Sequence, residues 1–200
     1  MDNTKMARVA KNLDIWANIG GKLTAAAGIV CIVTACLTLV FGNKMFAEGT
    51  ATLDLDFIKL HLSNTAYVNE QFLKFYVCAA TAGGSVICFL VAYVCRLLRK
   101  ILTPMKMGRP FESGISQHLK KVGWAVLAGG FLSELVGIIA RVLLIKAYSI
   151  GDLFASAAVS KTEYVFTMDF GFVLISCVIF FLSYIFAYGQ ALQQESDETL

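Results

Sequence analysis

The stretch from Leu23 to Gly42 reads LTAAAGIVCIVTACLTLVFG and carries no charged residue. A helix rises about 1.5 Å per residue, so about 20 residues match the roughly 30 Å hydrocarbon core of a lipid bilayer. This stretch therefore predicts a transmembrane helix, and it decides the class of fold: we expect a membrane protein.

Three more stretches have similar length and apolar character. Phe75–Cys95 (FYVCAATAGGSVICFLVAYVC) is uncharged, 170–192 is rich in Phe, Ile and Tyr, and 122–145 is apolar apart from Glu134 and Arg141. We expect one all-α integral membrane domain over residues 1–200. It would be a bundle of four transmembrane helices, with spans at about 22–42, 75–96, 122–146 and 169–191.

The composition agrees with a membrane protein. Hydrophobic residues make up 58% of the chain and charged residues 16%, whereas soluble domains have about half and about a quarter. The net charge of +3 is small, and the basic residues gather in a few segments rather than over a surface. This pattern argues against direct binding of nucleic acid.

The distribution of Lys and Arg predicts the orientation, because cytoplasmic segments retain positive charge during membrane insertion. Eleven lie in the N-terminal segment and in or beside the loop 97–121: Lys5, Arg8, Lys11, Lys22, Arg96, Arg99, Lys100, Lys106, Arg109, Lys120 and Lys121. Five lie in or beside the outer loops 43–74 and 147–168: Lys44, Lys59, Lys74, Lys146 and Lys161. Both termini and the loop 97–121 are therefore expected in the cytoplasm.

Two segments beside the spans have amphipathic helical patterns. In the N-terminal segment, apolar residues at spacings of three and four alternate with Lys and Arg. This pattern predicts a helix that lies in the cytoplasmic interface before the chain turns into the first span, either as a surface anchor or as a docking helix for a partner. Gly108 and Pro110 mark a turn before a second short interfacial helix, over 111–121.

The outer loops have strand-like patterns. In TLDLDFIKLHL, at 52–62, apolar and polar residues alternate through Phe57, and the phase slips at Ile58. Residues 159–170 have a similar β-branched and aromatic bias. Both patterns are typical of strands, so the two loops are expected to pair as a small β element outside the membrane.

Glu134 and Arg141 are the most informative residues, because ionisable side chains inside a membrane are costly and normally face a protein interior or a water-filled cavity. Glu134 falls near the centre of its span, and Arg141 lies two turns further out on the same face. Asp169 is expected at a depth that Arg141 can reach. The group forms either a closed polar network that fixes the helix register, or a cavity with a proton or ion relay at Glu134.

Small residues recur within the spans at Gly21, Ala25, Gly28, Ala80, Gly84, Gly130 and Gly137. They indicate close helix packing, either within one chain or in a homo-oligomer. The six cysteines lie in apolar runs, and a bridge between Cys36 and Cys78, at similar depth, stays open. The sequence has no HExxH, GxSxG or phosphate-binding loop, and His61 and His118 are expected on opposite sides of the membrane. We therefore expect no metal, no cofactor and no enzymatic activity.

Two motifs carry a family resemblance. The first is Gly108-Arg109-Pro110-Phe111, and the second is the ending GQALQQESDETL, with Gly189, Leu192, Gln193, Glu195, Asp197 and Thr199. With four spans in 200 residues, the chain resembles the bacterial membrane family called domain of unknown function 2975. Members have no assigned activity and are often encoded beside a small helix-turn-helix regulator of the Cro repressor type. The resemblance thus implies a regulatory link to such a protein.

These observations favour a non-enzymatic sensor or regulatory partner in the bacterial inner membrane. The alternative is a small transporter or channel subunit with a polar centre at Glu134 and Arg141. The acidic C-terminal tail either forms an electrostatic clasp with Arg109, Lys120 or Lys121, or serves as a handle for a cytoplasmic partner.

Overall fold

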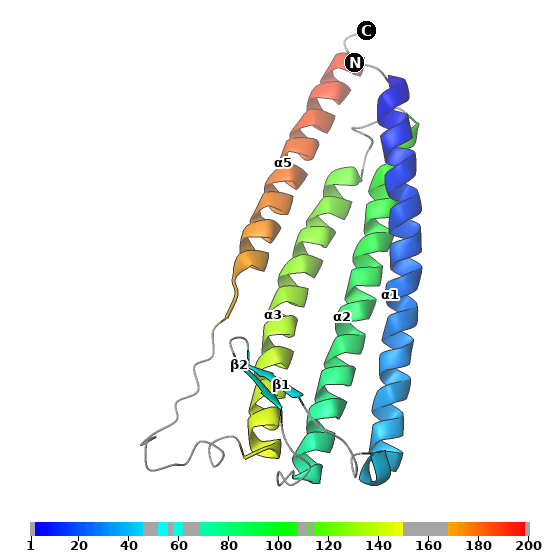
Figure 1. Ribbon diagram of the computed structural model, residues 1–200. Helices are drawn as coiled ribbons and strands as arrows, with labels where there is room; N and C mark the ends of the chain where they lie inside the picture. Colours follow the sequence, from blue (N-terminus) through cyan, green and yellow to red (C-terminus); the bar gives the residue numbers. More distant parts are fainter. Residues whose placement is uncertain are drawn as a thin grey trace. The chain divides into compact units, whose positions relative to one another are not determined.

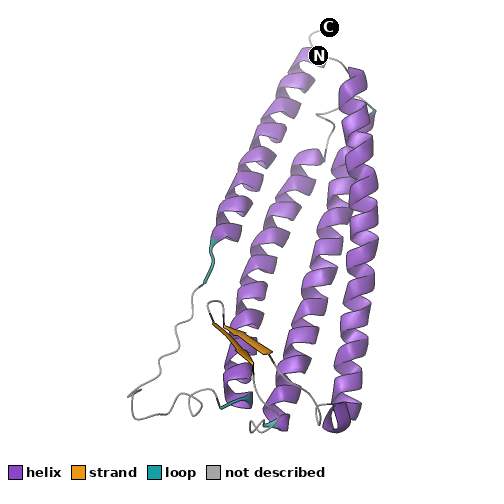
Figure 2. Ribbon diagram, viewed as in Figure 1, coloured by secondary structure: helices purple, strands orange, loops and turns teal. Residues whose placement is uncertain are grey.

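The computed structural model describes residues 3–45, 52–55, 58–61, 69–107, 112, 114–149 and 168–198. In this part of the chain it contains the helices α1 (Asn3–Met45), α2 (Glu70–Lys106), α3 (Ile115–Ala147) and α5 (Gly171–Glu198), together with two short strands (Figures 1 and 2). All four helices are long and apolar enough to cross a membrane. The chain is thus a multi-pass membrane protein, and the prediction of four spanning helices is confirmed.

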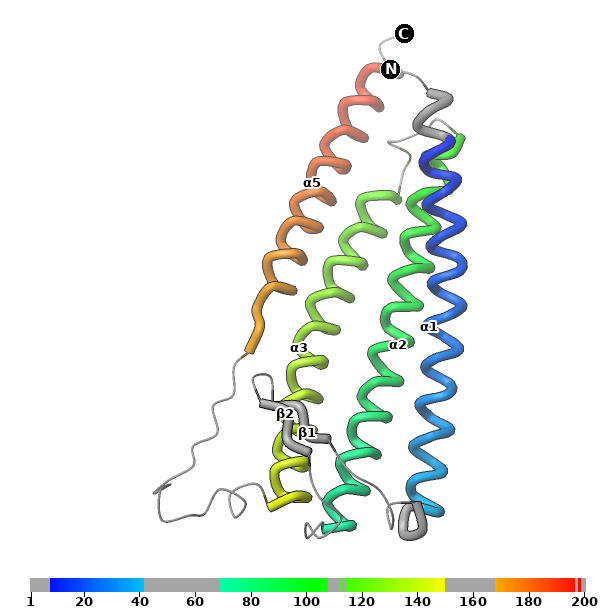
Figure 3. The backbone as a smooth tube through the Cα atoms, viewed as in Figure 1, coloured from blue at the N-terminus to red at the C-terminus, as the bar shows by residue number. Residues whose placement is uncertain are grey.

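The two expected interfacial helices are not separate elements. α1 is one continuous helix of 43 residues, so the N-terminal segment does not turn before the first span (Figure 3). Residues 115–121 are likewise the first turns of α3. The physical reason is that one side of each stretch contacts a neighbouring helix: Ala10 is buried and Asp14 bonds to α2, while Leu13 and Trp16 of the apolar face are exposed. In α3, Ile115 belongs to the core described below. The expected turn at Gly108 and Pro110 lies outside the described residues.

The strands β1 (Thr52–Leu55) and β2 (Ile58–His61) form an antiparallel pair in which Leu55 lies opposite Ile58. A single strand was expected over 52–62. The alternation of apolar and polar residues breaks at Ile58 because a second strand begins there, with its own alternation of side chains between the two faces. Of the second expected strand, at 159–170, only residues 168–170 are described, and they are not in a strand.

The chain packs as two compact units. The first consists of Met1–Ile29, Ser85–Ser133 and Met168–Leu200, and the second of Val30–Gly84 and Glu134–Thr167. In the first unit, a buried cluster joins Leu97 and Ile101 of α2 to Ile115 and Val122 of α3, with Ile179 and Phe186 of α5 packed against it. Elsewhere in this unit, large apolar side chains such as Leu23 and Leu174 are exposed, as expected of surfaces that face lipid.

Within the second unit, the start of α2 is attached to the end of α3. The side-chain oxygen of Asn69 accepts hydrogen bonds from the backbone N–H groups of Gln71 and Phe72, which caps α2. The backbone N–H of Asn69 donates to the carbonyl of Ala147 at 2.8 Å. In the same unit, Cys36 and Cys78 are both free thiols, so the bridge left open by the sequence is not formed.

Candidate functional site

The contact between α3 and α5, in the first unit, is a repeated notch-and-ring arrangement, which we call the α3–α5 seam (Gly123, Trp124, Gly130, Phe131, Phe172, Phe180). A Cβ atom added to Gly123 would lie 2.7 Å from the Phe180 ring, and one added to Gly130 would overlap the Phe172 ring. The aromatic residue after each glycine meets the same ring edge-on. Trp124 and Phe180 have centroids 5.5 Å apart, and Phe131 and Phe172 4.9 Å apart.

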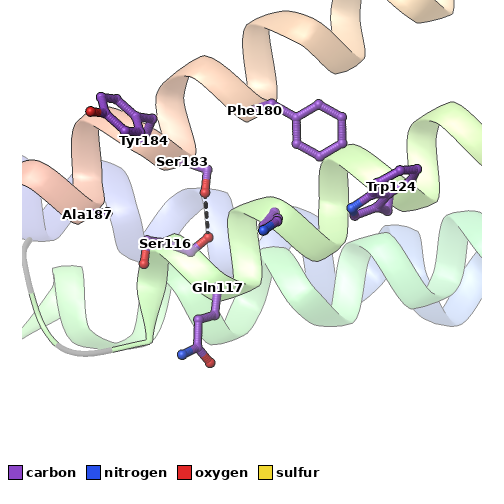
Figure 4. Close-up of a pocket in the computed structure, with 8 residues that line it drawn as sticks. Ser116, Gln117, Trp124, Phe180, Ser183, Tyr184 and Ala187 are labelled. Carbon is purple, nitrogen blue, oxygen red and sulfur yellow. Dashed lines mark hydrogen bonds between the residues drawn. The ribbon is translucent and has the colours of Figure 1, made fainter.

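A groove of about 530 Å³ opens at one end of this seam. Its lining consists of one face of α3 (Ser116, Gln117, Lys120, Trp124) and one face of α5 (Phe180, Ser183, Tyr184, Ala187) (Figure 4). These positions follow helical spacing on both helices. The groove is therefore a direct product of packing α3 against α5.

The groove has a buried polar contact and an exposed aromatic rim. The Ser183 hydroxyl is directed toward α3 and donates a 2.7 Å hydrogen bond to the backbone carbonyl of Ser116 (Figure 4). Ser183 is only 8% exposed, whereas Trp124 is 59% and Tyr184 73% exposed. Lys120 carries the only formal charge among the lining residues. This arrangement suits a ligand with an apolar part and an anionic part.

The surroundings of the groove on α3 are positively charged. Burial lowers the pKa of His118, which precedes the membrane span, below its ordinary value of 6.5, and the charges of Lys100 and Lys121 lower it further. The Nδ1 atom of His118 is buried and has no hydrogen-bond partner in the described part of the chain. Because a neutral ring adds no charge, the field at this end of α3 comes from the lysines.

A second polar cluster joins α1 to α2 in the first unit. Asp14 accepts hydrogen bonds from Arg99 Nε at 3.2 Å and from Lys106 Nζ, and Arg99 Nη1 donates to the Asn18 side chain at 2.9 Å. The bond from Lys106 holds the pKa of Asp14, which precedes the membrane span, below its ordinary value of 3.8, against the effect of partial burial. This cluster attaches the first turns of α1 to the last turns of α2.

The charged residues expected within the membrane lie apart from this groove. Glu134 and Arg141 belong to the second unit, where Glu134 is half-buried and Arg141 exposed. Neither has an ion-pair partner among the described residues. Asp169 is exposed and accepts a 2.8 Å hydrogen bond from the N–H of Gly171, so it caps the start of α5. No group of three metal-ligating side chains occurs among residues the structure describes.

The C-terminal motif continues α5. Gly189, Leu192, Gln193 and Glu195 all lie on this helix, and the side chains from 191 to 196 are exposed. Glu198 ends the helix and makes no ion pair with Lys120 or Lys121 among the described contacts. The other motif, Gly108 to Phe111, falls outside the described residues, as do Thr199 and the side chain of Asp197.

Sequence reasoning missed both the groove and the Asp14 cluster. The signal for the groove was a glycine followed by an aromatic residue, Gly123-Trp124, repeated seven residues later as Gly130-Phe131. The signal for the cluster was Asp14, an acidic residue inside the basic N-terminal segment. Each signal needed a partner on another helix, and the linear pattern does not show which helices are neighbours.

Comparison with known proteins identifies a family for the chain. Among curated proteins and solved structures, the comparisons found no match. A family model described as protein of unknown function (DUF2975) matches residues 61–200, which include α2, α3 and α5. The groove, both of its lining helices and the C-terminal motif all lie inside the matched region, and the chain belongs to the DUF2975 family.

Proposed function

We propose that the chain is a non-enzymatic regulatory protein of the bacterial inner membrane, which binds a cytoplasmic protein through the C-terminal end of α5. The observation that carries this proposal is the length of α5. The helix continues to Glu198, beyond the apolar stretch that ends near residue 192, and the side chains from 191 to 196 are exposed. An ordered, exposed helix at the end of a span offers a preformed surface to a partner.

The charge of this helical end supports a protein partner. Residues 193–198 contain Glu195, Asp197 and Glu198 and no basic residue. Acidic side chains on an exposed helical end complement a basic surface on a partner. The small helix-turn-helix regulator that the family resemblance implies is the first partner to test.

Site-specific photocrosslinking in living cells tests this proposal. A photoreactive amino acid at Gln193 is expected to crosslink to a small helix-turn-helix regulator of the kind that the family resemblance implies. The matched control carries the same photoreactive amino acid in place of Leu174, which is exposed on α5 inside the span. This position should crosslink only to lipid. Equal yields at the two positions, or no product with the regulator at any exposed position from 191 to 196, would contradict the proposal.

One observation favours the transporter as a second candidate. Glu134 is half-buried within the third span and has no ion-pair partner in the described residues, and an intramembrane carboxylate of this kind is a default candidate for a relay. We expect purified protein in liposomes to pass protons or a small cation, and Glu134→Gln to abolish this flux. Flux that is equal in the variant and the unaltered chain would remove Glu134 from the transport path.

A further inference from the structure

The groove between α3 and α5 lies at the boundary between the polar and apolar parts of α3. From Ser116 to Lys121 every residue except Leu119 is polar, and the apolar span begins at Val122. The groove includes residues from both sides of this boundary, from Ser116 to Trp124. A groove at this position would be level with lipid headgroups.

Exposed amphipathic aromatic residues mark the same level. Trp124 on α3 and Tyr184 on α5 belong to the rim, and Tyr188, one turn beyond Tyr184, is 62% exposed. Trp and Tyr are enriched at membrane interfaces because their rings prefer apolar surroundings while their polar groups remain hydrated. The open side of the groove therefore faces the region where lipid headgroups meet acyl chains.

The charge of the groove selects among lipids. Lys120 lines it, Lys121 is its neighbour in the chain, and no acidic side chain occurs among the lining residues. The acidic group next along α5 in the described part is Glu195, eight residues beyond Ala187, or roughly 12 Å along the helix. A zwitterionic headgroup would bring a positive charge toward Lys120, whereas an anionic headgroup would not.

We infer that this groove binds an anionic phospholipid of the surrounding bilayer, with Lys120 at the headgroup phosphate and the acyl chain along Trp124 and Phe180. The apolar stem of Lys120 can lie against the helix while its ammonium group stays at the headgroup level. Lipid binding here does not depend on the regulatory role proposed for the end of α5.

Tryptophan quenching by brominated lipids tests this inference. The chain has two tryptophans, Trp16 and Trp124, so Trp16→Phe leaves Trp124 as the only tryptophan, which is excited selectively over tyrosine. This variant is placed in phosphatidylcholine vesicles that contain brominated phosphatidylglycerol, or brominated phosphatidylcholine at the same mole fraction. The attraction of one lysine to an anionic membrane surface corresponds to about a fivefold preference for an anionic lipid over a zwitterionic one. We expect brominated phosphatidylglycerol to be preferred by about that factor.

Two variants and a matched control identify the site. Lys120→Gln should abolish the preference, and Ala187→Phe, which fills the groove without changing charge, should also abolish it. Lys121→Gln removes the same charge one residue away, outside the groove lining, and should retain the preference. Equal quenching by the two brominated lipids would overturn the inference. An equal loss in Lys121→Gln would overturn it too, because it would show attraction to a charged surface rather than binding in the groove.

Discussion

At the scale of single residues, two glycines of α3 differ in what surrounds them. Gly130 and Gly137 are seven residues apart on the same helix. A Cβ atom at Gly130 would overlap the Phe172 ring, whereas a Cβ atom at Gly137 would meet nothing within 4 Å. The same change of residue therefore has opposite consequences at the two positions.

Gly130→Ala is expected to lower the free energy of unfolding by about 1–3 kcal/mol, as overpacking in a tight contact does. Gly137→Ala, the matched control, should leave stability unchanged or raise it by up to about 1 kcal/mol, because alanine is the better helix former. Reversible unfolding in mixed detergent micelles measures both. Phe172→Ala in the Gly130→Ala background should restore part of the loss, and a strictly additive double variant would rule out the notch-and-ring contact.

Protonation of Asp14 at low pH is expected to weaken the attachment of α1 to α2. Because its pKa is lowered in the folded chain, the cluster stabilises the fold above the ordinary value of 3.8, and this contribution is lost as the pH falls through the lowered value. A partly exposed pair contributes little, on the order of 1 kcal/mol or less. The expected effect is therefore local.

Asp14→Asn is expected to speed amide hydrogen exchange in residues 8–21 at neutral pH, and acidification below about pH 3.8 should have the same effect on the unaltered chain. Lys11→Gln, on the same helix and outside the cluster, should leave the exchange rates unchanged. Rates that do not respond to Asp14→Asn would show that other contacts hold this part of α1 on α2.

At the scale of elements, α5 has two buried serines with different partners. The Ser176 hydroxyl donates to the carbonyl of Phe172 in its own helix at 2.8 Å, while the Ser183 hydroxyl donates to Ser116 of α3. Both residues are less than 9% exposed. Only the second bond holds two helices together.

Ser183→Ala should therefore weaken the association of α3 with α5 by about 0.5–1.5 kcal/mol, the net value of one hydrogen bond. Ser176→Ala should have a smaller effect, because its bond lies within a helix that already has its backbone bonds. Thermal unfolding in detergent, followed by disulfide crosslinking between cysteines introduced on α3 and α5, compares the two. A larger loss in Ser176→Ala would contradict the assignment of the interhelical bond.

The elements also show what the sequence could predict. The four spans followed from hydrophobic length, because bilayer thickness demands about 20 apolar residues. The helix ends did not: α1 runs unbroken from Asn3, where a separate interfacial helix was expected before the span, and α5 continues to Glu198, past the span expected to end near 191. Hydropathy reports where lipid surrounds the chain, whereas a helix ends only where its backbone hydrogen bonds end. The groove was beyond prediction because it requires knowing that α3 lies beside α5.

At the scale of the whole molecule, contacts between helices in the first unit show which helix ends lie side by side. The ion pairs of Asp14 place the first turns of α1 beside the last turns of α2, and the Ser183 bond places the start of α3 beside the second half of α5. Four crossings would put both termini on one side, and the distribution of Lys and Arg predicts that this side is the cytoplasm.

A fluorescent protein fused after Leu200 is expected to be fluorescent in the cytoplasm, and alkaline phosphatase at the same position should be inactive. The same two reporters, inserted after Lys59 in the β1–β2 region, should give the opposite results. Active phosphatase at the C-terminus would invert the orientation and move the exposed end of α5 out of reach of any cytoplasmic regulator.

The α3–α5 seam has one more consequence, for motion. Gly123 and Gly130 are seven residues apart on α3, and the rings that face them, Phe180 and Phe172, are eight residues apart on α5. Both contacts form together in one alignment of the two helices. Sliding one helix by a turn, about 5.4 Å, would lift both rings out of their notches at once. These contacts therefore oppose sliding of α3 along α5, and we expect a movement of one helix to carry the other with it.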